Sequence, residues 1–192
     1  MSTQAKSFLT PEQYLEIERK AEYKSEYYQG EMFAMAGASA AHCQLSSNVM
    51  ISLGNQVRGR PCRVLGSDMR IHIPAAGLFT YADVVALCGE WKFLDRGVPD
   101  TLVNPILIIE VLSLSTEAYD RGRKFEHYQS IESLRQYLLI SSDRVRAELY
   151  TRQPDNLWLL APYGRLEDSM DLESIGCRIL LSELYENVDF SQ

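Results

Sequence analysis

The sequence predicts a single α/β domain. Three observations support this prediction: an amphipathic helix pattern over residues 39–58, several strand-length apolar runs, and a strand at residues 106–112, apolar except for Glu110, followed by a helix pattern. Helix and strand periodicities that alternate along one chain are typical of domains in which helices pack on a sheet. A chain of 192 residues can bury a substantial core, and we expect residues 1–192 to form one domain.

Composition limits the classes of function. The net charge is −7, because 26 acidic residues outnumber 19 basic ones, and this argues against broad non-specific adhesion to nucleic acid. It does not exclude a nuclease, since a bound metal ion changes the local field. The apolar runs are too short to cross a membrane, and the first residues lack the apolar core of a signal peptide. We therefore expect a cytoplasmic protein with no membrane partner.

The four cysteines do not form a close C-x-x-C pair. A structural zinc site is therefore not expected. In a reducing compartment the simplest interpretation is that all four are small apolar residues.

The first part of the chain predicts two helices and a hairpin between them. A capping box with a proline at the first helical position starts a helix over residues 10–21. Residues 26–33 then indicate two short strands around Gln29-Gly30, and Glu31 is either a solvated strand residue or an accessory metal ligand. The long helix of residues 39–58 carries His42 in its first turn, where a helix-end hydrogen bond is the simpler interpretation and a functional role the alternative.

Two strand patterns follow. Residues 62–73 alternate at their end, which predicts a strand with one polar face. Residues 79–87 predict the next strand, with Asp83 in its middle, where a carboxylate is costly without a partner. Residues 89–104 indicate a connecting loop.

The segment of residues 105–128 is the most informative stretch. Its apolar run predicts a strand buried on both faces, yet this run contains Glu110, whose burial requires a partner or a metal. A helix should follow, with Thr116 as its N-cap. On that helix Asp120, Lys124 and Tyr128 are spaced four residues apart and should share one face.

The remaining residues predict further sheet. Residues 136–142 and 145–151 indicate a hairpin around Asp143-Arg144, and residues 156–161 another strand. A short strand and a helical turn should lie within residues 179–185.

Asp83 and Glu110 thus lie on neighbouring apolar strands, with a lysine on the next helix. If the strands pair in register, the two carboxylates can share a divalent ion such as Mg²⁺, which prefers oxygen ligands. The structural alternative is that Asp83 caps a turn, Glu110 pairs with an arginine, and Asp120 and Lys124 form a surface ion pair. Two acids inside apolar strands are harder to explain in that way.

The sequence resembles the putative restriction endonuclease family of the PD-(D/E)XK nuclease superfamily. The resemblance covers roughly residues 11–158, and its most specific part is the pattern P-x-x-x-x-E-V-x-S-x-S-T over residues 105–116. The weaker matching pieces are residues 27–31, 35–42, 81–85 and 136–138, together with Asp120, Lys124 and Tyr128. Ala82 stands where the superfamily motif has proline, and Leu112 where it usually has its lysine.

The resemblance implies an αβββαβ core with a mixed central sheet flanked by helices. It implies a Mg²⁺-dependent endonuclease, with Mn²⁺ as a substitute ion, in which Asp83 and Glu110 hold the metal and Lys124 replaces the missing lysine. Glu31, His42, Asp120 and Tyr128 would be accessory residues. Nucleic acid, DNA before RNA, is the expected substrate, and a homodimer or larger homo-oligomer is compatible with the family.

Two alternatives stay open. The first is a catalytically silent nuclease-like domain that binds nucleic acid or protein, with Lys124 and the arginines at positions 58, 60, 63, 121 and 123 contacting phosphates. The second is an oligomeric scaffold in which the acids are only ion-paired, and fold similarity alone does not decide between these functions.

Overall fold

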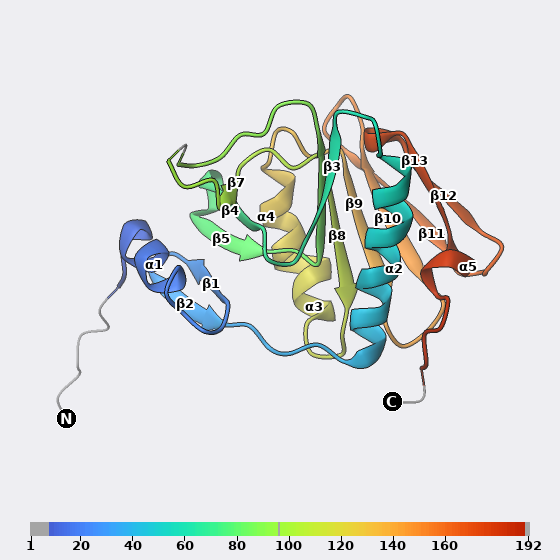
Figure 1. The fold of residues 1–192 in the computed structure, drawn as a ribbon, viewed down its shortest axis with the longest axis horizontal. Helices are drawn as coiled ribbons and strands as arrows, with labels where there is room; N and C mark the ends of the chain where they lie inside the picture. Colours follow the sequence, from blue (N-terminus) through green and yellow to red (C-terminus); the bar gives the residue numbers. More distant parts are fainter. Residues whose placement is uncertain (1–7, 96, 191–192) are drawn as a thin grey trace.

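A six-stranded mixed sheet forms the centre of the molecule in the computed structural model, which describes residues 8–95 and 97–190 (Figure 1). Residues 1–7, within the stretch where no signal peptide is expected, lie outside the described part. The strand order is β11-β10-β9-β8-β6-β3, and only β8 and β9 pair in parallel. The strands are β3 (Cys62–Gly66), β6 (Val84–Cys88), β8 (Leu107–Leu112), β9 (Gln136–Ser141), β10 (Ala147–Arg152) and β11 (Trp158–Tyr163).

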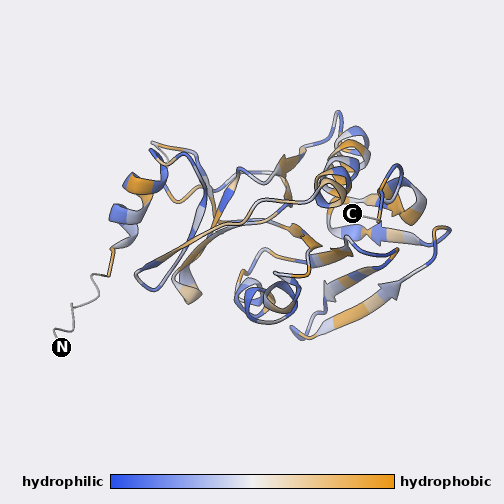
Figure 2. Ribbon diagram, turned by 90° about the horizontal axis from the view of Figure 1, so that it is seen from below, coloured by the Kyte–Doolittle hydropathy of each residue, from blue (hydrophilic) through white to orange (hydrophobic). Residues whose placement is uncertain are grey.

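Helices cover both faces of this sheet. On one face α2 (Ala40–Gln56) packs Leu45, Val49 and Leu53 against the sheet. On the other face α4 (Phe125–Gln129) packs Phe125 and Tyr128. Figure 2, seen from below, shows helices on the two sides of the strands. The order α2, β3, β6, β8, the helix after β8, and β9 is the predicted αβββαβ core, so the fold class is confirmed.

A smaller five-stranded sheet lies beside the large one, with the order β2-β1-β5-β4-β7. Its strands are β1 (Ser25–Tyr28), β2 (Glu31–Ala34), β4 (Arg70–Ile73), β5 (Leu78–Tyr81) and β7 (Thr101–Leu102). The helix α1 (Pro11–Glu18) starts with the predicted capping box and contacts β1. The predicted hairpin turn is confirmed, because Gln29 and Gly30 both have positive φ angles, of 47° and 94°.

Two predicted strands were each wrong in the same way. Residues 62–73 divide into β3 and β4, and residues 79–87 divide into β5 and β6. In both cases the first and second halves belong to different sheets. Asp83 therefore does not lie in the middle of a strand but in the break where the chain passes from the small sheet to the large one. Arg70, on the polar side of the alternating pattern, is nevertheless buried, with Tyr81, Thr101 and Asp100 around its guanidinium.

The helix after β8 also differs from the prediction. It consists of α3 (Glu117–Tyr119), a π-helical turn over Asp120–Lys124, and α4. Thr116 precedes it in a helical conformation without a side-chain cap, so its predicted N-cap bond is wrong; its hydroxyl instead lies 3.1 Å from the Ser113 hydroxyl. π-turns inside helices occur frequently at functional sites.

The C-terminal part follows the sequence more closely. The predicted hairpin around residues 143–144 is confirmed as β9 and β10, and the strand near Trp158 is β11. The last elements are β12 (Ser169–Leu172), β13 (Cys177–Leu180) and α5 (Leu181–Leu184), with 3-10 turns at Pro74–Ala76 and Glu173–Ile175. In the described part of the chain, the helices fall short of the length and apolar character that a membrane crossing needs.

The expectation that all cysteines are reduced is wrong for two of them. Cys62 and Cys88 lie directly opposite each other on β3 and β6 and form a disulfide, while Cys43 and Cys177 are free. The sequence separation of 26 gives no signal, because only the antiparallel register brings the two residues together.

We predict that the disulfide stabilises the protein by about 3 kcal/mol, because it closes a loop of the unfolded chain. A Cys62→Ser/Cys88→Ser variant should unfold at lower urea concentration than the parent, whereas Cys43→Ser should not. Thiol counting on the unreduced denatured protein should find two free thiols, and a count of four would contradict the prediction.

Candidate active site

Glu110 lies in the interior of the molecule on β8, between β6 and β9. It is 3% exposed. Its strand neighbours Ile108 and Leu112 pack in the apolar cluster of α4, so alternation places Glu110 on the same face. There the hydroxyl of Tyr128 donates a hydrogen bond of 2.9 Å to Glu110 Oε1. A buried carboxylate of this kind needs such partners, because desolvation of an unpaired charge is costly.

The main partner of Glu110 is Lys124, from the π-helical turn. Lys124 Nζ lies 3.0 Å from Glu110 Oε1 and 3.4 Å from Asp120 Oδ1, and it donates a 3.2 Å hydrogen bond to the carbonyl of Tyr81. The lysine is itself buried, at 5% exposure. The ion pair of Asp120 and Lys124, which the structural alternative placed on the surface, is therefore an internal one.

A third carboxylate, from Glu26 on β1, completes the surroundings of Lys124. Glu26 Oε1 lies 3.7 Å from Lys124 Nζ and accepts a hydrogen bond from the Thr80 hydroxyl. Tyr119 donates to the other oxygen at 3.1 Å. Sequence reasoning missed Glu26, because a glutamate that alternates with Ser25 and Tyr27 in a short hairpin strand resembles a solvated residue.

Asp83 lies in the break directly before β6, within hydrogen-bonding distance of Val111, the residue after Glu110. Its Oδ2 accepts a 2.7 Å hydrogen bond from the backbone N–H of Val111. Its Oδ1 lies 2.8 Å from His42 Nε2, on the first turn of α2. The antiparallel pair Val84 and Ile109 is the last one before the break, so Asp83 and Glu110 occupy the next positions of the same register.

The structure thus brings together most of the residues predicted from the sequence. Lys124, Asp120 and Tyr128 contact one another or Glu110, and His42 contacts Asp83. Glu31 begins β2 opposite Tyr28, and this pair is two register positions from the pair of Glu26 and Phe33; the part of Glu31 in the site stays a prediction.

The arginines expected to contact phosphates are partly engaged elsewhere. Arg121 pairs with Glu117 and Glu148, and Arg60 donates to carbonyls of residues 175 and 176. Arg123 is exposed, with its guanidinium 5.4 Å from the centre of the Tyr28 ring. Lys124 is buried and faces the carboxylates, so it is not a surface phosphate contact.

The cluster holds more acids than bases. Burial raises the pKa of Glu110 to about 8; the Lys124 ammonium opposes this rise, and Asp120 and Asp83 reinforce it. Burial alone would lower the pKa of Lys124, but the carboxylates of Glu110, Asp120 and Glu26 hold it well above its ordinary value. The carboxylates therefore favour the charged form of Lys124, while burial opposes the ionisation of Glu110 beside it.

The donor set suits a hard divalent cation. Carboxylate oxygens from Asp83 and Glu110 are the ligands that Mg²⁺ prefers, and it commonly takes only one or two from the protein and completes its shell with water. Among the described residues no three His, Cys, Asp or Glu side chains are grouped closely enough to hold a metal by themselves.

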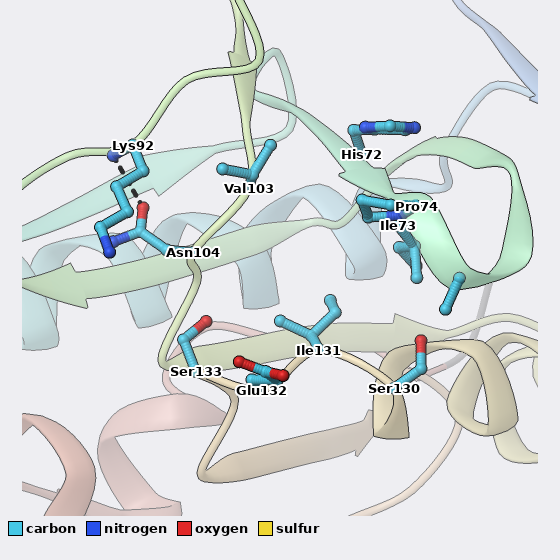
Figure 3. A pocket seen from close by; sticks show the side chains of 11 residues that line it. His72, Ile73, Pro74, Lys92, Val103, Asn104, Ser130, Ile131, Glu132 and Ser133 are labelled. Carbon is cyan, nitrogen blue, oxygen red and sulfur yellow. Dashed lines mark hydrogen bonds between the residues drawn. The ribbon is translucent and has the colours of Figure 1, made fainter.

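A separate hollow of about 610 Å³ lies between the turn after β4, the segment near Lys92 and the residues after α4 (Figure 3). His72, Asn104 and Glu132 are among the residues that line it. Neither Asp83, Glu110 nor Lys124 lines this hollow. The chemistry of the buried charges, and not the size of a cavity, therefore marks the candidate active site.

Comparison with known proteins agrees with the α/β fold described above. Residues 11–181 match the Uma2 family of putative restriction endonucleases. Two uncharacterized proteins from Synechocystis sp. are similar: one is 36% identical, covering 95% of this chain and 94% of its own, and the other is 40% identical, covering 79% and 85%. The crystal structure of a putative nuclease belonging to DUF820 from Anabaena variabilis matches with a TM-score of 0.75 at 16% identity, covering 92% of this chain and 97% of that one.

We predict that the buried charge of Glu110 makes the metal-free protein less stable at higher pH. The pKa of Glu110 is higher in the folded chain than its ordinary value of 4.5, so the folded state binds this proton more tightly. The contribution of Glu110 to the free energy of unfolding is fully present below about pH 4.5 and is lost as the pH rises toward about 8.

Urea unfolding in the presence of a chelator checks this. Glu110→Gln keeps an acceptor for Tyr128 but cannot ionise, so its unfolding free energy should fall less than that of the parent between about pH 5 and about pH 8. If the unfolding free energies of the parent and of Glu110→Gln change with pH in the same way, the raised pKa of Glu110 is contradicted.

Proposed function

This chain belongs to the Uma2 family of putative restriction endonucleases, and we propose that it is a Mg²⁺-dependent phosphodiester hydrolase acting on nucleic acid, with DNA as the first candidate substrate. The observation that supports this most directly is the buried contact of 3.0 Å between Glu110 and Lys124, beside Asp83. An acid and a lysine together in a protein interior are costly to desolvate, and such perturbed groups concentrate at functional sites.

Each residue has a distinct role in the proposed site. Asp83 and Glu110 would hold the metal, which when bound polarises the phosphodiester and lowers the pKa of water. His42 orients the Asp83 carboxylate, and Tyr128 orients that of Glu110, through the hydrogen bonds each makes. Lys124 would orient the attacking water and stabilise the negative charge that develops on the phosphate. Leu112 stands where the superfamily usually has its lysine, and in the proposed site Lys124 from the following helix would take the part of that lysine.

The metal assignment predicts that Glu110→Ala abolishes Mg²⁺ and Mn²⁺ binding in calorimetry while the protein stays folded. The fold should survive because Lys124 retains Asp120 and Glu26 as partners. Asp171→Ala, which removes an exposed carboxylate paired with Arg178, is the matched control and should bind metal as the parent does. Unchanged metal affinity in Glu110→Ala would exclude Glu110 as a ligand.

The role of Lys124 gives a second prediction. Lys124→Ala should cleave DNA roughly a hundred- to a thousandfold more slowly than the parent while binding Mg²⁺, because one electrostatic contact to the transition state is lost, at a cost of about 2.7–4 kcal/mol in the barrier. Lys124→Met removes the charge at similar length, and Lys124→Arg tests whether a broader cation suffices.

Lys20 offers a control for Lys124. It forms an exposed pair with Glu16 at the same i,i+4 spacing, so Lys20→Ala should leave the rate unchanged. Cleavage by Lys124→Ala at the parent rate would exclude its catalytic role. A parent protein that binds DNA in a salt-dependent way but does not cleave it with Mg²⁺ or Mn²⁺ would favour the catalytically silent alternative.

A further inference from the structure

Glu26 approaches Lys124 from a different part of the molecule than the other two acids. Asp120 lies on the same helix, four residues before Lys124, and Glu110 lies on the large sheet beneath it. Glu26 extends from β1 of the small sheet, with its side chain 14% exposed. Its carboxylate therefore connects the small sheet to the lysine.

The carboxylate of Glu26 is itself fixed in place. The hydroxyls of Thr80 on β5 and Tyr119 on α3 donate to its two oxygens. Tyr28 follows two residues later on the same strand, so it lies on the same face of β1. Its ring contacts Arg123 and His127 of the helix after β8, which carries Lys124. β1 thus packs on this helix through two side chains, of which only Glu26 contacts the ammonium.

This geometry matters once Glu110 coordinates a cation. Its negative charge is then shared with the metal, whose positive charge repels the nearby ammonium. Asp120 lies on the same helix as Lys124, so their ion pair does not link the ammonium to another element, and the Tyr81 carbonyl that accepts from Lys124 at 3.2 Å carries no charge. Glu26 remains as a carboxylate anchored outside that helix.

We propose that Glu26 is a positioning residue, which holds the Lys124 ammonium in place when Glu110 is engaged by a divalent cation. This inference rests on the proposed function of Glu110 and Lys124. The carboxylate of Glu26 contacts Lys124, Thr80 and Tyr119, so we place its action on the lysine.

The test uses Glu26→Gln, which removes the charge at nearly the same side-chain size and keeps one oxygen acceptor for the two hydroxyls of Thr80 and Tyr119. At saturating Mg²⁺ we expect kcat to fall roughly ten- to a hundredfold, because a small displacement of a catalytic group is costly, while KM for DNA and calorimetric Mg²⁺ affinity stay unchanged. Tyr28→Ala is the matched control: it weakens the packing of β1 on the helix without touching the carboxylate. It should lower the melting temperature more than Glu26→Gln does and kcat less.

A second measurement does not depend on cleavage. The NMR resonance of the Lys124 ammonium, assigned by its loss in Lys124→Met, should persist in the parent protein with and without Mg²⁺. In Glu26→Gln it should persist without Mg²⁺, where Glu110 holds the lysine, and broaden or vanish when Mg²⁺ is added.

The outcomes separate the two proposals. If the resonance responds as expected but the parent cleaves no nucleic acid, the proposed function fails and the positioning role stands. An identical resonance in the two proteins under both conditions overturns the positioning role. A loss of Mg²⁺ affinity in Glu26→Gln overturns the positioning role as well. So does a fall in kcat that is explained by a lower melting temperature, with Glu26→Gln and Tyr28→Ala losing kcat in proportion to their loss of melting temperature.

Discussion

The buried ion pair of Glu110 and Lys124 is the constraint on which the rest of the site depends. Two charges removed from water are stable only where other groups satisfy their remaining donors and acceptors. Here Tyr128 donates to the carboxylate, and the Tyr81 carbonyl accepts from the ammonium. The pair and its partners come from β8, from the helix that follows it and from the end of β5 earlier in the chain, so these three segments must meet at one point.

The passage between the two sheets explains where Asp83 stands. The chain leaves β5 in the small sheet and enters β6 in the large sheet, and Asp83 occupies the break. A residue in the interior of a strand would direct its backbone N–H and C=O into the ladder and its side chain to one face. At the break the carboxylate can accept from the Val111 N–H at 2.7 Å and also meet His42 from α2. The same break places the Tyr81 carbonyl beside Lys124.

The small sheet has a clear part in this arrangement. It carries Glu26 and Tyr28 on one face of β1, and both contact the helix that supplies the lysine. Its own interior is held by Arg70, which contacts Tyr81, Thr101 and Asp100. Since Tyr81 also contacts Glu18 of α1, a continuous polar network extends from α1 to the residue that binds Lys124.

The sequence by itself determined the α/β class, the buried strand with its acid, and the lysine that follows, because these depend on local periodicity and on the cost of burying charge. It misplaced the ends of β3 and β5 and gave no sign of Glu26, the π-helical turn or the disulfide. Strand breaks between sheets, cross-strand register and partners more than eighty residues apart have no local signal. They are decided only when the two sheets pack together, since packing alone sets which buried charges share one site.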